Sequence, residues 1–385
     1  MSRLKLAAIL ACALLLAGCS SFGSNQPDKS ALPALEYTRP EGEQMENHTQ
    51  KTVKYKGSLS DGSGFVMYYT NELEISGVEL TAQLKVEPEL AESLKTANVL
   101  TLNVETVGTS ACSDLDAIRQ INLGENLSAI QSYAFSKCTM LDKVVFPASL
   151  TQIGDYAFQG CSSLRSADIP SNVTALGRRV FAECSMLLSA NLDTDVGDST
   201  FADCTSLRDV TFGAGCHIIG SNAFSGCVGI RSLSLGADVE QIGSHAFSGC
   251  TALEQLSVET SLDEAAFSGC TALRDITFGA GCLTIGEEAF SGCTGLKNLS
   301  IDEGVERIEK RAFSGCTALE YVRYPASLQY IGSLAFSGAQ SITKVESMDT
   351  IKYWSARYTF EKDWNENSNI GAVEMKQAKK DEPAA

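Results

Sequence analysis

Cysteine is the residue type in this sequence that could do the most varied chemistry. Fourteen cysteines and three histidines occur in 385 residues. Such a number could form disulfides, hold metal ions or supply nucleophiles. However, there is no CxxC pair and no Cys/His spacing typical of zinc sites, so we expect no metal site. Ten cysteines recur at one phase of a sequence repeat or beside it, which favours a role in packing.

The histidines give little support for catalysis. His217 and His245 lie at different phases of the repeat, and the pattern places no base beside a Ser or Cys. We therefore expect no catalytic residues, no cofactor and no enzymatic activity. Neighbouring repeats would place equivalent cysteines about 4.8 Å apart, which a disulfide permits, but their Cβ vectors would run parallel. Buried, unreactive thiols are the better interpretation.

These residues must be positioned by a repeated unit. The octet AFSGCTAL occurs three times without change, at 246–253, 266–273 and 312–319. Its Phe recurs at intervals of 23 or 20 residues, and the intervals group into 66-residue triplets. A period of this length predicts a solenoid, because stacked coils bury apolar faces that one coil cannot bury alone. The repeated phenylalanines are Phe135, Phe158, Phe181, Phe201, Phe224, Phe247, Phe267, Phe290, Phe313 and Phe336.

Each coil can be numbered from its Cys. Leu follows at +3, apolar residues at +6 and +8, a turn residue at +9, Ile or Leu at +15 and Gly at +16. Residues +6 and +8 point to the same side of a short strand, so both are expected in the core. The frame also fits an eleventh coil upstream, with Leu115 in the Cys slot and Cys112 in the Phe slot. We expect positive φ at the +16 glycines, which are Gly154, Gly177, Gly220, Gly243, Gly286 and Gly332.

The repeat IGxxAFxxCxxLxxIxFP resembles the BspA-like leucine-rich repeat family over roughly residues 110–347. The resemblance implies a right-handed leucine-rich repeat solenoid with a parallel β-sheet on its concave side. We expect about eleven coils of 23, sometimes 20, residues, with a small α/β N-terminal cap and a C-terminal cap. About eleven strands at about 4.8 Å predict a body on the order of 50 Å long.

The N-terminus has the form of a secretory signal. Arg3 and Lys5 precede an apolar run that is too short to span a bilayer. The run ends in LAGC at residues 16–19, which resembles the lipobox of bacterial lipoproteins. The resemblance implies that Cys19 is the lipid attachment site, and two or more acyl chains anchor a protein firmly. The alternative is an ordinary cleaved signal that happens to contain a cysteine.

Composition divides the rest of the chain. Strands are expected at 65–69, 80–86 and 99–104, and a short helix is expected to begin at Pro88. Aromatic residues at 353–364 are interpreted as part of a cap, with an exposed binding patch as the alternative. The predicted domains are a lipoprotein signal peptide (1–18), a flexible tether (19–55), the N-terminal cap (56–108), the leucine-rich repeats (109–347), the C-terminal cap (348–370) and a disordered tail (371–385).

Two sets of surface residues could bind a partner. Residues +5 and +7 should face out of the concave sheet, and we prefer the end with Tyr321 and Arg323, because Tyr and Arg are frequent at binding hot spots. The alternative is a featureless, solvated sheet. The candidate concave face consists of Lys143, Asp168, Asn191, Asp209, Gln255, Asp275, Asn298, Tyr321, Arg323 and Lys344.

A basic stripe occupies position +4 and is interrupted by Glu254. It could attract an anionic partner such as a glycan or an acidic protein segment. We favour the simpler interpretation, in which the stripe forms ion pairs with adjacent acids such as Asp209 and Asp275. The basic stripe consists of Arg165, Arg208, Arg231, Arg274 and Lys297.

Net charge and the family resemblance together indicate a binding protein of the bacterial envelope. The formal net charge of −17 argues against nucleic-acid binding. BspA-like proteins are implicated in adhesion, so the resemblance implies a lipid-anchored adhesin at the outer membrane or cell surface. Its partner would be a protein or glycan ligand, including extracellular matrix, met by a monomer whose N-terminal lipid holds it to the membrane. The alternative is a periplasm-facing scaffold that binds another bacterial protein.

Overall fold

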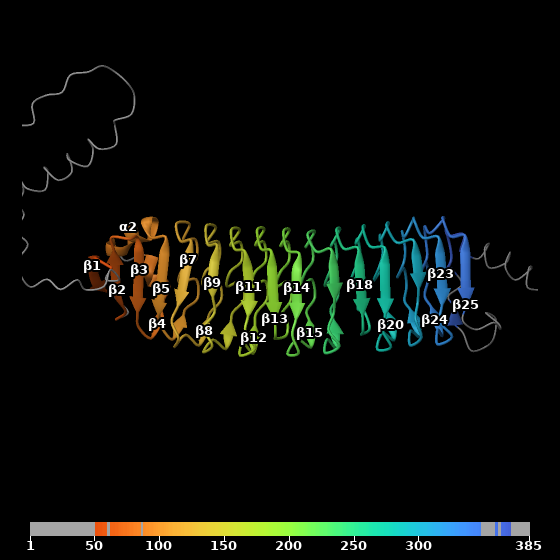
Figure 1. Ribbon diagram of the computed structural model, residues 1–385, viewed down its shortest axis with the longest axis horizontal. Coiled ribbons are helices and arrows are strands. Elements are labelled where there is room, and N and C mark those ends of the chain that lie inside the picture. The colour runs from red at the N-terminus through yellow and green to blue at the C-terminus, as the bar shows by residue number, and fades with distance from the viewer. Residues whose placement is uncertain (1–50, 60–61, 86–87, 348–358, 361–362, 371–385) are drawn as a thin grey trace, which may run out of the picture. The chain divides into compact units, whose positions relative to one another are not determined.

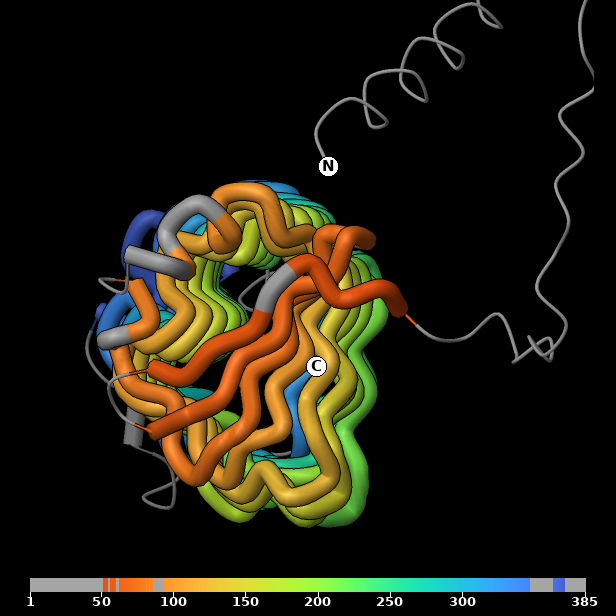
Figure 2. The backbone as a smooth tube through the Cα atoms, turned by 90° about the vertical axis from the view of Figure 1, so that its left-hand side faces the viewer, coloured from red at the N-terminus to blue at the C-terminus, as the bar shows by residue number. Residues whose placement is uncertain are grey.

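Stacked coils form the body of this protein. The computed structural model describes residues 51–59, 62–85, 88–347, 359–360 and 363–370. Within them, long strands stand side by side in one nearly straight row (Figure 1), and a view from the end shows successive coils superimposed as rings (Figure 2). The predicted parallel solenoid is confirmed.

The long strands carry the apolar residues at +6 and +8 into the core. From β11 to β13 the parallel register pairs Ala167 with Ala190 and Ile169 with Leu192, and all four side chains are buried. The register therefore stacks like positions of successive coils. These strands are β3 (Glu72–Ser76), β5 (Val99–Asn103), β7 (Gln120–Leu123), β9 (Lys143–Val145), β11 (Ser166–Ile169), β13 (Ser189–Leu192), β14 (Asp209–Phe212), β16 (Ser232–Ser234), β18 (Gln255–Val258), β19 (Asp275–Phe278), β21 (Asn298–Ser300), β23 (Tyr321–Tyr324) and β25 (Lys344–Ser347).

Short strands on the opposite side of each coil place the +15 residue in the core. In the two 20-residue coils, Val196 and Leu262 occupy the position equivalent to +15 and are joined to neighbouring coils by isolated β-bridges. The three residues that these coils lack are therefore absent from the turn before the short strand. These strands are β4 (Glu79–Leu80), β6 (Thr106–Val107), β8 (Ala129–Ile130), β10 (Gln152–Ile153), β12 (Ala175–Leu176), β15 (Ile218–Ile219), β17 (Gln241–Ile242), β20 (Thr284–Ile285), β22 (Arg307–Ile308), β24 (Tyr330–Ile331) and β26 (Thr359–Phe360).

The N-terminal part joins the stack earlier than the repeat pattern indicates. β1 (Val53–Ser58) and β2 (Gly64–Tyr68) are antiparallel, but β3 already pairs with β5 in parallel, and β5 with β7. The helix α2 (Pro88–Thr96) begins where it was predicted. The strand expected over 80–86 is wrong, because β4 ends at Leu80 and a 3-10 helix, η1 (Ala82–Lys85), follows.

A ladder of phenylalanines forms the centre of the core. All ten repeated Phe side chains are fully buried. Consecutive rings are stacked, with centroids 5.0 to 5.6 Å apart. This spacing lies in the favourable range for offset stacking, which adds about 0.5–1.5 kcal/mol per pair to the gain from burial. At the C-terminal end Trp364 meets the last ring, Phe336, edge to face at 6.2 Å.

The +16 glycines serve a different purpose from the one predicted. None of them has positive φ. Most glycines with positive φ instead directly precede the Cys slot, as Gly249 does with φ 74°, and the exceptions are Gly62 and Gly304. At Gly243 an added Cβ would lie 2.8 Å from the backbone N of Ser221 in the preceding coil. Glycine is therefore favoured at Gly243 because neighbouring backbones approach closely there, although Gln131 and Glu309 occupy +16 in two other coils.

Replacing Gly243 by Ala should separate two coils locally and cost about 3 kcal/mol of unfolding free energy, because the new Cβ meets backbone that cannot rotate away. Gly249→Asn is the matched control. Asn tolerates left-handed backbone, and an added Cβ there has no neighbour closer than 3.8 Å, so it should cost about 1 kcal/mol or less. Urea denaturation measures both, and a larger loss at Gly249 would contradict this account.

The long strands are grouped in threes along the repeats. Hydrogen-bonded sheets join β11, β13 and β14, then β16, β18 and β19, then β21, β23 and β25. β14 and β16 are neighbours in the stack without strand pairing, and so are β19 and β21. The groups therefore recur with the 66-residue period that the sequence shows.

Candidate functional site

The outward side of the long strands is the surface proposed from the sequence, and we call it the long-strand face. Of its ten predicted residues, eight are exposed, while Tyr321 and Arg323 are partly buried. The parallel register aligns them in columns that run along the stack, as with Asp168, Asn191 and Thr211. The residues are therefore spread from β9 to β25 as a strip and do not converge on one point.

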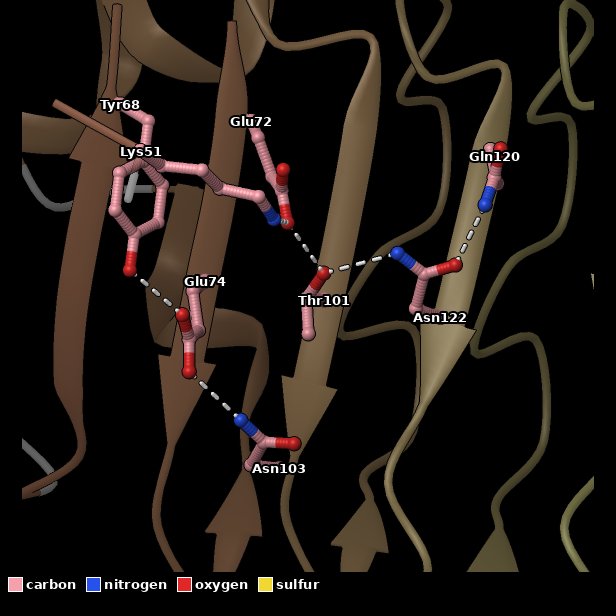
Figure 3. A network of polar contacts seen from close by, with 8 residues as sticks. All are labelled: Lys51, Tyr68, Glu72, Glu74, Thr101, Asn103, Gln120 and Asn122. Carbon is pink, nitrogen blue, oxygen red and sulfur yellow. Dashed lines mark hydrogen bonds and ion pairs between the residues drawn. The ribbon is translucent and has the colours of Figure 1, made fainter. Parts of the chain in front are cut away.

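The same face continues upstream in a polar network that the sequence analysis missed (Figure 3). Glu72 is only 7% exposed. It accepts hydrogen bonds from Lys51 Nζ at 2.5 Å and from Thr101 Oγ1 at 3.0 Å. Asn122 then donates to Thr101 Oγ1 at 3.1 Å, and Gln120 to Asn122 at 2.7 Å. The network thus joins β3, β5 and β7 across the start of the repeats.

A second branch of the network centres on Glu74. Tyr68 donates its hydroxyl to this carboxylate at 2.9 Å, and Asn103 donates to it at 2.8 Å. The hydrogen bond to Glu74, followed by burial, raises the pKa of Tyr68. The alternation of Glu72 and Glu74 with buried Leu73 and Ile75 is the sequence signal that could have placed both acids on this face.

A shallow depression lies on the long-strand face above β9, β11 and β13, at the N-terminal end of the strip. Its volume is about 230 Å³, and its walls include Val145, Phe146, Asp168, Pro170 and Asn191. Asn191 donates to Asp168 across it. Small-molecule sites usually exceed about 300 Å³ and enclose most of their ligand. The depression therefore suits one side chain of a larger partner better than a free substrate.

The C-terminal end of the face holds an aromatic and charged cluster. The Tyr321 hydroxyl donates to Glu346 at 2.6 Å, and Lys344 Nζ lies 2.5 Å from the same carboxylate. Lys344 also lies over the Tyr321 ring, 5.1 Å from its centroid. Hydrogen bonds from Lys344 and then Tyr321 lower the pKa of Glu346. Tyr321 is thereby held in one orientation with its ring edge still partly accessible.

The basic stripe lies at the edge of the long-strand face, one residue before each strand. All five of its side chains are exposed. The ion pairs expected with Asp209 and Asp275 do not form: among the described residues, no salt bridge includes any member of the stripe.

The cysteines of the body are free and buried, as predicted. Each thiol in the Cys slot points at the carbonyl of the Phe-slot residue of an earlier coil, as Cys161 Sγ does toward Phe135 O at 3.2 Å and Cys138 Sγ toward Cys112 O at 3.1 Å. Burial raises the pKa of Cys250 to about 12, and burial followed by the neighbouring Cys138 raises that of Cys161 strongly. These thiols are protonated at neutral pH and out of reach of a substrate, so they cannot act as nucleophiles or metal ligands.

The histidines do not complete a site in the described part of the chain. His217 lies 3.9 Å from Asp195, and both side chains are about half exposed. His245 belongs to a left-handed turn with φ 59°. No group of three or more His, Cys, Asp or Glu side chains that could hold a metal ion occurs among the residues that the structure describes. Cys19 lies outside the described residues.

The repeats match the family model described as BspA type leucine-rich repeat region, in six copies over residues 91–197, 188–264 and 258–366. The chain belongs to this family. Membership in the BspA-type family indicates a repeat protein that binds other proteins. No curated protein matches the sequence.

Several solved structures are similar to this BspA-type chain. A leucine-rich repeat protein from Bacteroides ovatus has 23% identity and a TM-score of 0.48, covering 82% of this chain and 99% of its own. A leucine-rich cell surface protein from Faecalibacterium prausnitzii has 21% identity and a TM-score of 0.37, covering 80% and 98%. The pneumococcal vaccine antigen PcpA has 16% identity and a TM-score of 0.45, covering 81% and 91%.

In the described part of this chain, no helix has the length and apolar character to cross a bilayer.

Proposed function

We propose that this chain is a lipid-anchored protein of the bacterial cell surface that binds host matrix or other cell-surface proteins through its long-strand face. The observation that best supports this proposal is a polar strip that runs along the whole stack and ends in the Tyr321 cluster. Extended surfaces of stacked repeats suit large protein partners, because affinity accumulates over many coils. No enzymatic step is part of this proposal.

The Tyr321 cluster is the part of the strip best suited to anchor a partner. Tyr and Arg supply large contact areas, and Tyr321 is already immobilised by Glu346, so little conformational entropy is lost on binding. The smaller side chains of the central coils, such as Ser232 and Ser234, would provide a close fit around it. The partner would therefore lie along the C-terminal coils.

The double variant Tyr321→Ala/Arg323→Ala should weaken binding to the preferred matrix protein about 30-fold, the effect of losing one hot spot of about 2 kcal/mol. Tyr330→Ala/Arg307→Ala is the matched control, since Arg307 lies over the Tyr330 ring, 4.2 Å from its centroid, on the short-strand side of the stack. Surface binding of the purified full chain to a panel of matrix proteins measures both. Equal losses would place the contact elsewhere.

The anchor and the display of the protein are tested on intact cells. Cys19→Ala should release the protein from the membrane fraction, because the predicted acylation site is lost. Added protease should digest the wild-type repeats without lysis. Full protection from protease would defeat the adhesin proposal and favour the alternative of a periplasm-facing scaffold.

A further inference from the structure

The basic stripe stands out because its cations have no partner among the residues that the structure describes. Arg119 lies in the same row, two coils before Arg165, and Asp142 lies between them: the Asp142 N–H donates to Arg119 O at 2.9 Å, and the Arg165 N–H donates to Asp142 O at 3.3 Å. Within the residues that the structure describes, no side chain of the stripe, and not that of Arg119, makes a hydrogen bond, an ion pair or a cation–π contact. The chain has a net charge of −17 and 47 acidic residues, so cations on its surface would be expected to find acidic partners. The lack of pairing at this one repeat position is therefore unexpected.

Cations at two other repeat positions, +17 and +18, behave differently. Arg178 pairs with Asp155 at 3.2 Å, Lys310 with Glu287 at 2.6 Å and Arg311 with Glu288 at 3.2 Å. These side chains are as exposed as those of the stripe, so exposure alone does not prevent pairing. Selective lack of pairing in the stripe leaves its charges available to an external anion.

The stripe also has a periodic internal structure. Arg208 and Arg231 lie in adjacent coils on either side of the break between β14 and β16, and Arg274 and Lys297 lie likewise at the break between β19 and β21. Within a sheet the N–H of Arg274 donates to Glu254 O at 3.0 Å, whereas no backbone bond joins Arg231 to Arg208. These two breaks thus combine two cationic side chains with backbone N–H groups that lack a strand partner in the described chain. The break between β9 and β11 differs, because Asp142 and Arg165 lie there and the Arg165 N–H donates to Asp142 O at 3.3 Å.

We infer that the basic stripe binds a sulfated polysaccharide that lies across the coils, with one anionic group at each of the two breaks. The paired cations recur every three coils, about 15 Å apart along the stack. Guanidinium groups bind tetrahedral oxyanions such as sulfate with two hydrogen bonds, and a sulfate ester remains ionised at any physiological pH. A chain polymer with repeated sulfates can satisfy both breaks at once, which raises its overall affinity.

Other polyanions fit the stripe less well. Double-stranded DNA carries one charge per about 1.7 Å, far denser than the stripe, and would be repelled more strongly by the acidic body. Repulsion from acidic residues more than about 8 Å away is largely screened at physiological salt. A polymer with widely spaced charges therefore interacts mainly with the nearby cations of the stripe. An acidic peptide would need apolar contacts for specificity, but the only apolar residue in the row is Leu188. The row also contains the acids Asp142, Glu254 and Glu320, so a ligand must place its anionic groups at the cations and leave the positions of these acids free of charge.

The test uses the purified full chain and heparin as the probe. The variant Arg208→Gln/Arg231→Gln/Arg274→Gln/Lys297→Gln should bind heparin about 100-fold more weakly than wild type, since each exposed charge pair contributes up to about fivefold. The dependence of log affinity on log salt should also become shallower by about 3, for four lost contacts.

The matched control is Arg178→Gln/Arg307→Gln/Lys310→Gln/Arg311→Gln, which removes the same number of positive charges from cations that are already paired. It should bind heparin within about threefold of wild type, because those charges are already neutralised by their partners. Circular dichroism checks that both variants fold. An equal loss in both variants would overturn the proposal, because only net charge would then matter.

Three further results decide the class of ligand. Failure of wild type to bind heparin at about 0.15 M salt would overturn the inference. Tighter binding of polyglutamate or of single-stranded DNA than of heparin would also overturn it, in favour of an acidic peptide or a nucleic acid. Tyr321 and Arg323 belong to the long-strand face and not to the basic stripe, so Tyr321→Ala/Arg323→Ala should leave heparin binding unchanged. Failure of this inference can therefore be distinguished from failure of the proposed adhesin function.

Discussion

At pH 10, in the presence of a reductant, the repeat body is expected to be unfolded, although it is folded at pH 8. Ten thiols in the Phe and Cys slots are almost completely buried, and burial raises the pKa of each above its ordinary value of 9.0. For Cys204, Cys250 and Cys293 the value is about 12. The charged thiolate is therefore much less stable in the folded core than in the unfolded chain.

The sign of the effect follows from the direction of these shifts. Below pH 9 the thiols are protonated in both states, so their contribution to stability is complete. Between pH 9 and about 12 the unfolded chain loses protons that the folded chain retains, which favours unfolding. Each thiol costs about 1.4 kcal/mol per pH unit, and ten thiols cost about 14. A typical stability of about 5–15 kcal/mol would be exhausted within roughly one unit above pH 9.

Urea denaturation from pH 8 to pH 9.5, followed by circular dichroism, measures this dependence. The variant Cys227→Ala/Cys250→Ala/Cys270→Ala/Cys293→Ala is the control, because it removes four of the twelve thiols whose pKa burial raises, Cys216 and Cys282 included. It should start less stable because of small cavities, yet lose stability with pH at only about two thirds of the wild-type rate. A body that stays folded at pH 11 would show that the thiols do not couple ionisation to folding.

Phe247→Ala is expected to lower the unfolding free energy by about 3–5 kcal/mol. Phe247 is fully buried, with its ring 5.0 Å from that of Phe224 and 5.1 Å from that of Phe267. The substitution removes two stacking contacts and leaves a cavity that the close-packed coils on either side cannot fill. Because each coil is stabilised mainly by its neighbours, the loss should weaken the stack at its centre.

Two substitutions calibrate the effect of Phe247→Ala in guanidinium denaturation. Phe247→Leu keeps most of the volume and should cost about 1.5 kcal/mol or less. Val145→Ala, at a side chain that is 62% exposed, should change stability by less than about 0.5 kcal/mol. If Phe247→Ala were no worse than Val145→Ala, the ladder would contribute little to the stability of the body.

The sequence by itself determined the architecture and the core. Phe at intervals of 23 or 20 residues, Leu at +3 and apolar residues at +6 and +8 leave one way to bury all of them, which is stacking in register. The burial of the thiols followed from the same periodicity, since cysteine replaces Phe or an aliphatic residue in interior slots. Local periodicity was sufficient here because every coil meets the same neighbours.

Only the tertiary structure decided how neighbouring coils meet. It showed that Gly243 is needed for close approach to Ser221, where the sequence alone had indicated positive φ. It also showed that β3 and β5 join the stack. In the described part of the chain the basic stripe forms no ion pair, and two pairs of its cations lie at breaks in the sheet. Distances between coils depend on backbone separation and side-chain direction across 20 or more residues, and a repeat pattern specifies which positions align but not how closely they approach.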